Sequence, residues 1–135
     1  MAALVDADYA NLLAFRTQLR RFNHWSETQA RRAGLTHMQH QLLVAVRGHP
    51  DSRGPTIGDV ADYLLLRHHS AVELANRVEA GGWVERHRDG EDGRIVRLGL
   101  TEKGTTVLES LSELHLNELG RLAPLLDHLV AGLPD

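Results

Sequence analysis

The chain has 135 residues, 42% of them hydrophobic, and a formal net charge of -3. This length and hydrophobic content are enough for one domain with its own core. It contains no cysteine, which excludes disulfides, thiolate metal sites and thiol-based redox sensing. Its apolar runs fall far short of the ~20 residues of a membrane span and its N-terminus lacks a signal peptide's pattern, so we expect a soluble cytoplasmic protein without a membrane partner.

The first predicted element is a long helix over about residues 7–32, which Gly34 ends. Its apolar side chains recur at spacings of 3, 4 and 3, and they are Leu12, Phe15, Leu19 and Phe22. This spacing gives the helix one apolar face along its length.

Two shorter helices should begin at threonines that act as N-caps. Thr36 has Gln39 three residues later, and Thr56 has Asp59 at the same spacing, so each pair can form a reciprocal capping box. The apolar residues that follow each threonine supply a buried face.

The next helix is predicted from residue 68 or 69 to Ala80, with Gly81 ending it in the left-handed conformation. Its inward stripe is Ala71, Leu74, Ala75 and Val78. The outward set is polar and varied, and it comprises Ser70, Glu73 and Arg77, with Arg67, His68 and His69 at the N-terminal end. That composition is typical of a helix that reads base edges.

The periodicity then changes from 3.6 to 2, which predicts strands over 83–88 and 96–100. Two Asp-Gly pairs between them supply the turn of a hairpin. Arg88 and Arg94 should lie at its tip, within reach of a minor groove or phosphates. Arg86 and Arg97 are either solvated strand residues or phosphate contacts.

Thr101 should cap a final helix, whose apolar positions continue beyond Pro124. Because proline cannot continue a regular helix through its own position, we expect a break or kink between Leu119 and Pro124 and a short terminal helix after it. The terminal helices carry more apolar surface than the central module can cover, so pairing with a second copy is expected.

The acidic net charge does not exclude a nucleic-acid ligand. Residues 98–135 hold two basic and six acidic residues, which leaves residues 1–97 with a net charge of +1. Compact DNA-binding proteins need a basic patch rather than a basic total.

In series, the segments RVEAGGWVERHRDGEDGR and LTEKG give the chain a resemblance to the multiple-antibiotic-resistance regulator (MarR) family of winged-helix transcription factors. The resemblance covers nearly the whole chain. It implies a mainly α fold with a small β wing: a winged helix-turn-helix over 36–101, and dimerisation helices over 1–34 and 102–135, in a single domain spanning 1–135.

The resemblance also implies a homodimer that binds a pseudo-palindromic operator in double-stranded DNA, as a ligand-responsive repressor associated with the nucleoid. The DNA-binding residues would be Arg67, His68, His69, Ser70, Glu73, Arg77, Arg88, Asp92 and Arg94, with Asp92 orienting Arg94 on the wing. Glu73 has two readings: it accepts a hydrogen bond from cytosine N4, or it pairs with Arg77. A small aromatic or anionic effector would bind beside His24, Trp25 and His40.

The residues also bear on metal binding, on catalysis and on protein interaction. His37, His40, His68 and His69 invite a metal hypothesis, but no carboxylate or cysteine completes a recognisable ligand set, so no metal and no cofactor are predicted. No catalytic motif is present, so we expect no enzyme. The alternative to a regulator is a winged-helix protein-interaction module without specific DNA binding, which the balanced charge of residues 67–97 motivates.

Overall fold

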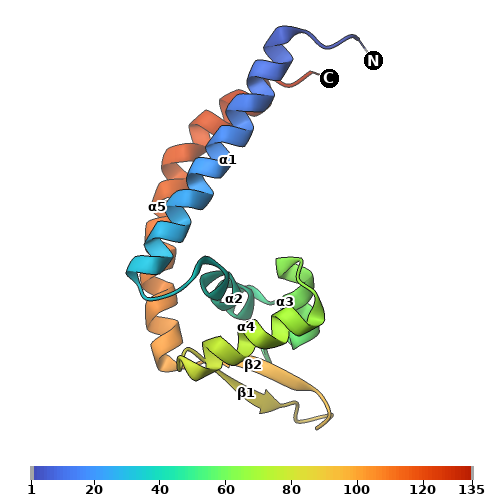
Figure 1. Cartoon of the computed structure of the whole chain (residues 1–135), viewed down its shortest axis with the longest axis vertical. Coiled ribbons are helices and arrows are strands. Elements are labelled where there is room, and N and C mark those ends of the chain that lie inside the picture. Colours follow the sequence, from blue (N-terminus) through green and yellow to red (C-terminus); the bar gives the residue numbers. More distant parts are fainter. Residues whose placement is uncertain (1, 135) are drawn as a thin grey trace.

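The computed structural model describes residues 2–134, which form five helices and one two-stranded antiparallel sheet. In chain order the elements are α1 (Asp6–Arg32), α2 (His37–Gly48), α3 (Ile57–Leu64), α4 (His68–Ala80), β1 (Val84–Arg88), β2 (Val96–Leu100) and α5 (Glu102–Ala131). Figure 1 shows α1 and α5 running side by side away from a compact module made of the other elements. The predicted mainly α fold with a small β wing is confirmed.

The core lies where the compact module meets the base of the α1 and α5 pair. Its buried side chains come from all five helices and both strands, and they include Ala30, Leu42, Leu43, Val60, Val78, Val84, Leu98 and Leu108. Because α1 and α5 both contribute, the helix pair is anchored in the same core that holds α4 in place.

Both predicted capping boxes are present. The Thr36 Oγ1 accepts a hydrogen bond from the Gln39 amide at 3.1 Å, and the Gln39 side chain accepts one from the Thr36 amide at 2.9 Å. Thr56 and Asp59 exchange the same two bonds at 3.0 and 3.1 Å. These bonds satisfy amides that the first helical turn leaves unpaired, so they fix where α2 and α3 begin.

The end of α4 differs from the prediction at one residue. Gly81 has a right-handed conformation, and the left-handed residue is Gly82, with φ +82°. Gly81 is required for a different reason, because a Cβ there would overlap the Trp83 ring. The turn places Trp83 against the helix end and starts β1 directly afterwards.

The predicted break before Pro124 is wrong. The helix α5 runs without interruption from Glu102 to Ala131, with Pro124 inside it. The proline still has no amide to donate to the carbonyl of Gly120. The apolar positions on both sides of it, Leu122 and Leu129, are buried, and their packing keeps the helix continuous.

The strands β1 and β2 pair in register from Val84 with Leu100 to Arg88 with Val96. The far edge of β2 is also covered, because the Leu98 amide donates to the Pro55 carbonyl at 2.9 Å and Thr56 forms a bridge with Arg97. The segment before α3 therefore acts as a third element of the wing. None of the helices within residues 2–134 is both long enough and apolar enough to span a membrane.

Candidate nucleic-acid interface

The outer face of α4 is exposed along its length. Arg67 is its N-cap, and the exposed residues behind it include His68, His69, Glu73 and Arg77. Ser70 is partly buried in the first turn. In residues 2–134, no ion pair within 4.0 Å joins Glu73 to Arg77, so the intrahelical pairing is not formed.

The tip of the wing holds Arg94 in a defined orientation. Its Nε and Nη2 each donate to an Asp92 carboxylate oxygen at 3.1 Å, and its amide donates to the same carboxylate at 3.0 Å. These hydrogen bonds lower the pKa of Asp92 and keep it ionised. The Arg94 side chain is nevertheless 91% exposed, so the pair presents a cation to solvent in a fixed position. Arg88 supports the tip by donating to the Gly93 carbonyl at 2.6 Å.

Near the turn, the hairpin of the wing contains a buried ion pair that the sequence did not predict. Arg97 is buried, so neither the solvated reading nor the phosphate reading of this residue is right. Its Nε donates to Asp89 Oδ2 at 3.0 Å, and its Nη1 donates to the Gly54 carbonyl at 2.9 Å. Asp89, which had been assigned only to a turn, is itself buried. Strand alternation placed Arg97 on the solvent side, but the segment before α3 covers that side.

The same network includes the loop between α2 and α3. Arg53 binds Asp51 through Nη2 at 2.7 Å and reaches Asp89 through Nη1 at 3.3 Å. Its carbonyl lies 2.9 Å from His87 Nε2 on β1. The hydrogen bonds from Arg53 hold the pKa of Asp51 well below its usual range. The loop and the wing are thus joined by both charge and backbone bonds.

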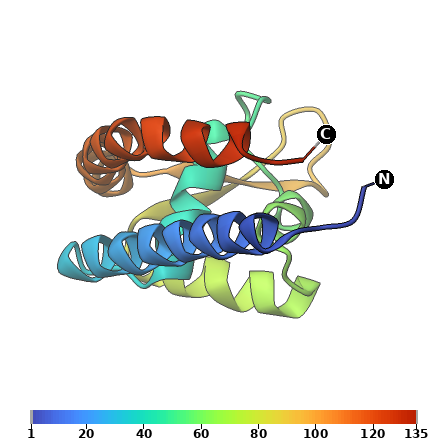
Figure 2. The same ribbon diagram turned by 90° about the horizontal axis from the view of Figure 1, so that it is seen from above.

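Arg86 ties the wing to α4. Its Nη2 donates to Asn76 Oδ1, and its Nε lies 3.7 Å from the Glu79 carboxylate. Figure 1 shows the N-terminal end of α4 and the tip of the wing on the same side of the module, away from the α1 and α5 pair, and Figure 2 shows the module from above. The two candidate contact surfaces are therefore held in a fixed relation.

A cavity of about 450 Å³ lies between the terminal helices and α2. Its lining includes Phe22, Ser26, His37, His40 and His115. Nδ1 of His115 donates to the Leu111 carbonyl at 2.7 Å, so its Nε2 accepts from the Ser26 hydroxyl at 2.7 Å. The buried Nδ1 of His37 has no hydrogen-bond partner in the described part of the chain.

His40 is uncharged at neutral pH. Burial, followed by the proximity of His115 and His37, lowers its pKa from 6.5 to about 4. The rings of His40 and His115 lie 4.8 Å apart between centroids. The cavity therefore offers a neutral imidazole at His40.

Of the three residues assigned to an effector, His40 lines this cavity. Trp25 lies behind it, with its ring 4.9 Å from that of His115. His24 is exposed and is not among the lining residues. Phe22, His37 and His115 were missed, because α1, α2 and α5 come together only in the folded chain.

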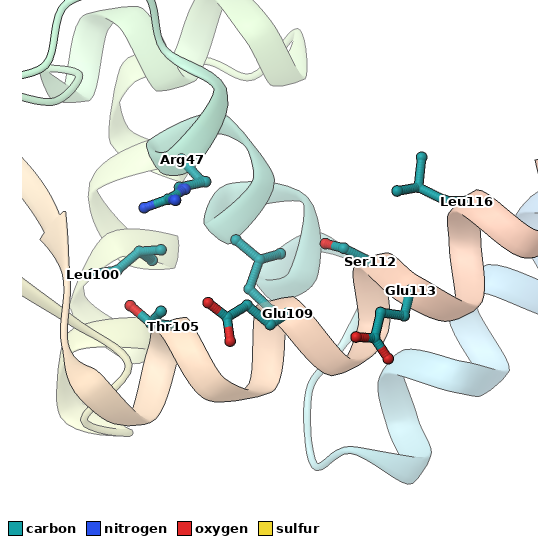
Figure 3. Close-up of a pocket in the computed structure, with 8 residues that line it drawn as sticks. Arg47, Leu100, Thr105, Glu109, Ser112, Glu113 and Leu116 are labelled. Carbon is teal, nitrogen blue, oxygen red and sulfur yellow. The ribbon is translucent and has the colours of Figure 1, made fainter.

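A second cavity, of about 310 Å³, adjoins the first along α5 and shares Ser112 and Leu116 with it. Figure 3 shows Glu109 and Glu113 on α5 at this cavity, with Arg47 of α2 and Leu100 of β2 opposite. Two carboxylates and one guanidinium make it less suited to an anion than the histidine-lined cavity. Among residues 2–134, no group of three or more His, Asp or Glu side chains has a geometry that would hold a metal ion.

Comparison with known proteins places these features in context. Residues 33–95 match the family model described as MarR family. The chain is 32% identical over 114 residues to the transcriptional activatory protein BadR of Rhodopseudomonas palustris, an alignment that covers 83% of this chain and 65% of BadR. The chain thus spans just under two thirds of the length of this curated relative.

Two solved structures show the same fold. A MarR family protein from Bacillus stearothermophilus has a TM-score of 0.75 at 23% identity, over 89% of this chain and 82% of that one. The S. aureus MepR in its DNA complex has a TM-score of 0.69 at 20% identity, over 82% and 78% of the two chains.

Proposed function

This chain belongs to the MarR family, and we propose that it is a homodimeric regulator of transcription that binds a pseudo-palindromic operator in duplex DNA. The observation that carries the proposal is the fixed relation between the exposed face of α4 and the wing tip, where Asp92 holds Arg94 at 3.1 Å. A helix of this composition fits a major groove, and a cation on a hairpin fits the neighbouring minor groove.

In this proposal Arg67, His68, His69, Ser70, Glu73 and Arg77 face the major groove. Arg88, Asp92 and Arg94 belong to the wing, where Arg94 is the direct contact and the other two hold it. Because Glu73 does not pair with Arg77, we propose that its carboxylate accepts a hydrogen bond from cytosine N4. Residues 36–101 form the DNA-binding region of the single domain. The protein acts in the cytoplasm, at the nucleoid, and the proposal assigns it no catalytic role.

The terminal helices, over 1–34 and 102–135, supply the dimer interface. The pairing of α1 with α5 leaves large apolar side chains exposed on both helices, and they include Leu12, Leu13, Leu19, Leu116, Leu119 and Val130. A patch of this extent is typical of a protein interface, and a second copy presents the same apolar patch. Two copies would then present two α4 helices to one face of a duplex.

An effector would bind in the histidine-lined cavity, between the helices that form the dimer and the module that contacts DNA. Its volume of about 450 Å³ fits a small aromatic molecule, and Phe22 supplies an aromatic wall. A neutral imidazole such as that of His40 can donate an N–H hydrogen bond to a carboxylate. Release of DNA follows if the ligand favours a dimer spacing that the operator does not match.

The sign of regulation depends on the position of the operator. A dimer bound across a promoter blocks transcription, and we propose this repressor role. The relative BadR is named as an activatory protein. A reporter driven by the regulated promoter, with and without the protein, distinguishes the two.

A salt titration of binding to the protein's own promoter fragment, beside a shuffled duplex of equal length, tests the proposal. A regulator prefers the promoter fragment by ~10³-fold or more and loses affinity steeply as salt rises. Equal and weak affinity for both duplexes would instead support the interaction module. Phenylacetate and its neutral amide, added to the complex, then test whether an aromatic carboxylate releases the DNA.

A further inference from the structure

Leu65, the C-cap of α3, has two properties that are unusual for a leucine. It is the one non-glycine residue in 2–134 with a positive φ, at +55°. Its side chain is 91% exposed, more than any other large hydrophobic residue in the described part of the chain.

Both properties make leucine a poor choice for the stability of this turn. A side chain in the left-handed conformation is strained against its own backbone, and glycine avoids that strain. The backbone bonds of the turn do not depend on the side chain, because the amides of Leu65 and Leu66 both donate to the Ala61 carbonyl. An exposed leucine also gains nothing from burial. A strained residue that the fold does not explain points to a contact outside the chain.

The position of Leu65 indicates the kind of contact. Leu65 lies two residues before Arg67, which is the N-cap of α4. Arg67, His68 and His69 are all exposed. Figure 1 shows this turn at the end of α4 that faces the wing tip. Charged and titratable neighbours suit a nucleic acid better than an apolar protein surface, because the centres of protein interfaces are depleted of charge.

We propose that Leu65 is a specificity-determining residue, whose side chain contacts the 5-methyl group of a thymine in the major groove beside α4. The inference rests on the proposed function and adds an apolar contact to its polar ones. Thymine is the one base that offers a methyl group in the major groove, and apolar side chains recognise it there. Burial of one methyl group corresponds to about a fourfold change in affinity.

The test uses the duplex that the wild-type protein protects in its own promoter, and a series in which each protected thymine is replaced by deoxyuridine. Wild-type protein loses about fourfold in affinity for each contacted methyl group that is removed. Leu65→Gly and Leu65→Asn both tolerate the left-handed conformation, and both bind the thymine duplex more weakly while ignoring the replacement. Leu65→Met keeps an apolar side chain and retains part of the discrimination. Deoxyuridine outside the protected region has no effect on any variant.

Thermal unfolding separates a contact from a structural role. Leu65→Gly unfolds at the same temperature as the wild type or higher, since the strain is relieved. A variant that merely loosens the turn would weaken binding to both duplexes equally and would keep the methyl discrimination. That result, or a Leu65→Gly variant that binds like the wild type, overturns the inference alone. A wild-type protein with no preferred duplex defeats the proposed function and this inference with it.

Discussion

Arg97 Nε lies 3.0 Å from Asp89 Oδ2, and both side chains are buried near the turn end of the wing hairpin. The same guanidinium donates to the Gly54 carbonyl, in the loop before α3. One arginine therefore connects the hairpin, close to its turn, to the loop before α3.

Replacing Arg97 with leucine should lower both stability and DNA affinity. The substitution removes a guanidinium from the buried Asp89 carboxylate, which keeps only the Glu91 amide and the more exposed Arg53, and breaking a buried ion pair is destabilising. We expect the melting temperature to fall by several degrees and the affinity for the operator to fall with it. The double variant Arg97→Leu/Asp89→Leu should recover much of the stability. Failure of the second substitution to restore any stability would show that the ion pair is not the cause.

Arg94→Ala should weaken binding to every duplex without changing the melting temperature. The side chain is exposed and in the proposal it brings a cation into the minor groove between the phosphates, so the slope of log K against log salt should decrease by about 1 for each wing. Ser70→Ala and Glu73→Ala should instead change which sequence is preferred. Arg31→Ala, on α1 and paired with Glu27, is the matched control and should leave binding unchanged. Equal effects of Arg31→Ala and Arg94→Ala would remove the wing from the interface.

His40 should make the protein less stable in mild acid. Its pKa is about 4 in the folded chain and 6.5 in the unfolded chain, so the unfolded chain binds the proton more readily between these values. The free energy of unfolding is therefore highest above pH 6.5 and falls as the pH drops toward 4, by up to about 2 kcal/mol after an allowance for solvent. Denaturant titrations at pH 7, 5.5 and 4.5 measure the change. In a His40→Gln variant the free energy of unfolding should depend less steeply on pH. If the pH dependence of the variant equals that of the wild type, other groups cause the effect.

Pro124→Ala should stabilise α5. Alanine restores the amide that the proline lacks and removes the ring that a proline directs at the carbonyl four residues earlier, within a helix that is continuous through this position. We expect a gain of about 1 to 3 kcal/mol in the free energy of unfolding, measured by denaturant titration. A loss of stability would mean that a local distortion at Pro124 is needed for packing.

Leu13→Glu should separate the dimer. Leu13 is 65% exposed on α1, so a charge there costs the single subunit little, whereas it would be buried in the interface. Sedimentation should show a single subunit at concentrations where the wild type is a dimer, and operator affinity should fall at least tenfold. The melting temperature of the wild type should rise with protein concentration, and that of the variant should not. A dimer that persists in the variant places the interface elsewhere.

Local sequence signals predicted the helix starts well, because each signal and its partner lie within one helical turn. Thr36 with Gln39 and Thr56 with Asp59 are such pairs. At Pro124 the local rule failed, since tertiary packing on both sides outweighs one missing hydrogen bond. Gly81 was predicted to be left-handed, but it is right-handed, and glycine is needed there because a Cβ would overlap the nearby Trp83 ring.

In the candidate site, too, contacts between neighbours in the sequence were predicted and contacts between distant residues were not. The Asp92 and Arg94 pair lies two residues apart and was predicted from the motif. The burial of Arg97 depends on Gly54, which is 43 residues away, so strand alternation alone could not find it. The histidine-lined cavity draws on α1, α2 and α5, and no spacing in the sequence places His115 beside His40.

The attachment of the wing to the loop before α3 restricts how the dimer can change shape. With Arg53, Gly54 and Pro55 bonded to both strands of the hairpin and to Asp89, bending the wing alone would break several contacts at once. Each α4 and its wing should therefore swing together as one rigid lever about the connections to α1 and α5. A molecule bound near those connections would change the distance between the two α4 helices of the dimer and would leave the structure of each α4 and wing unchanged.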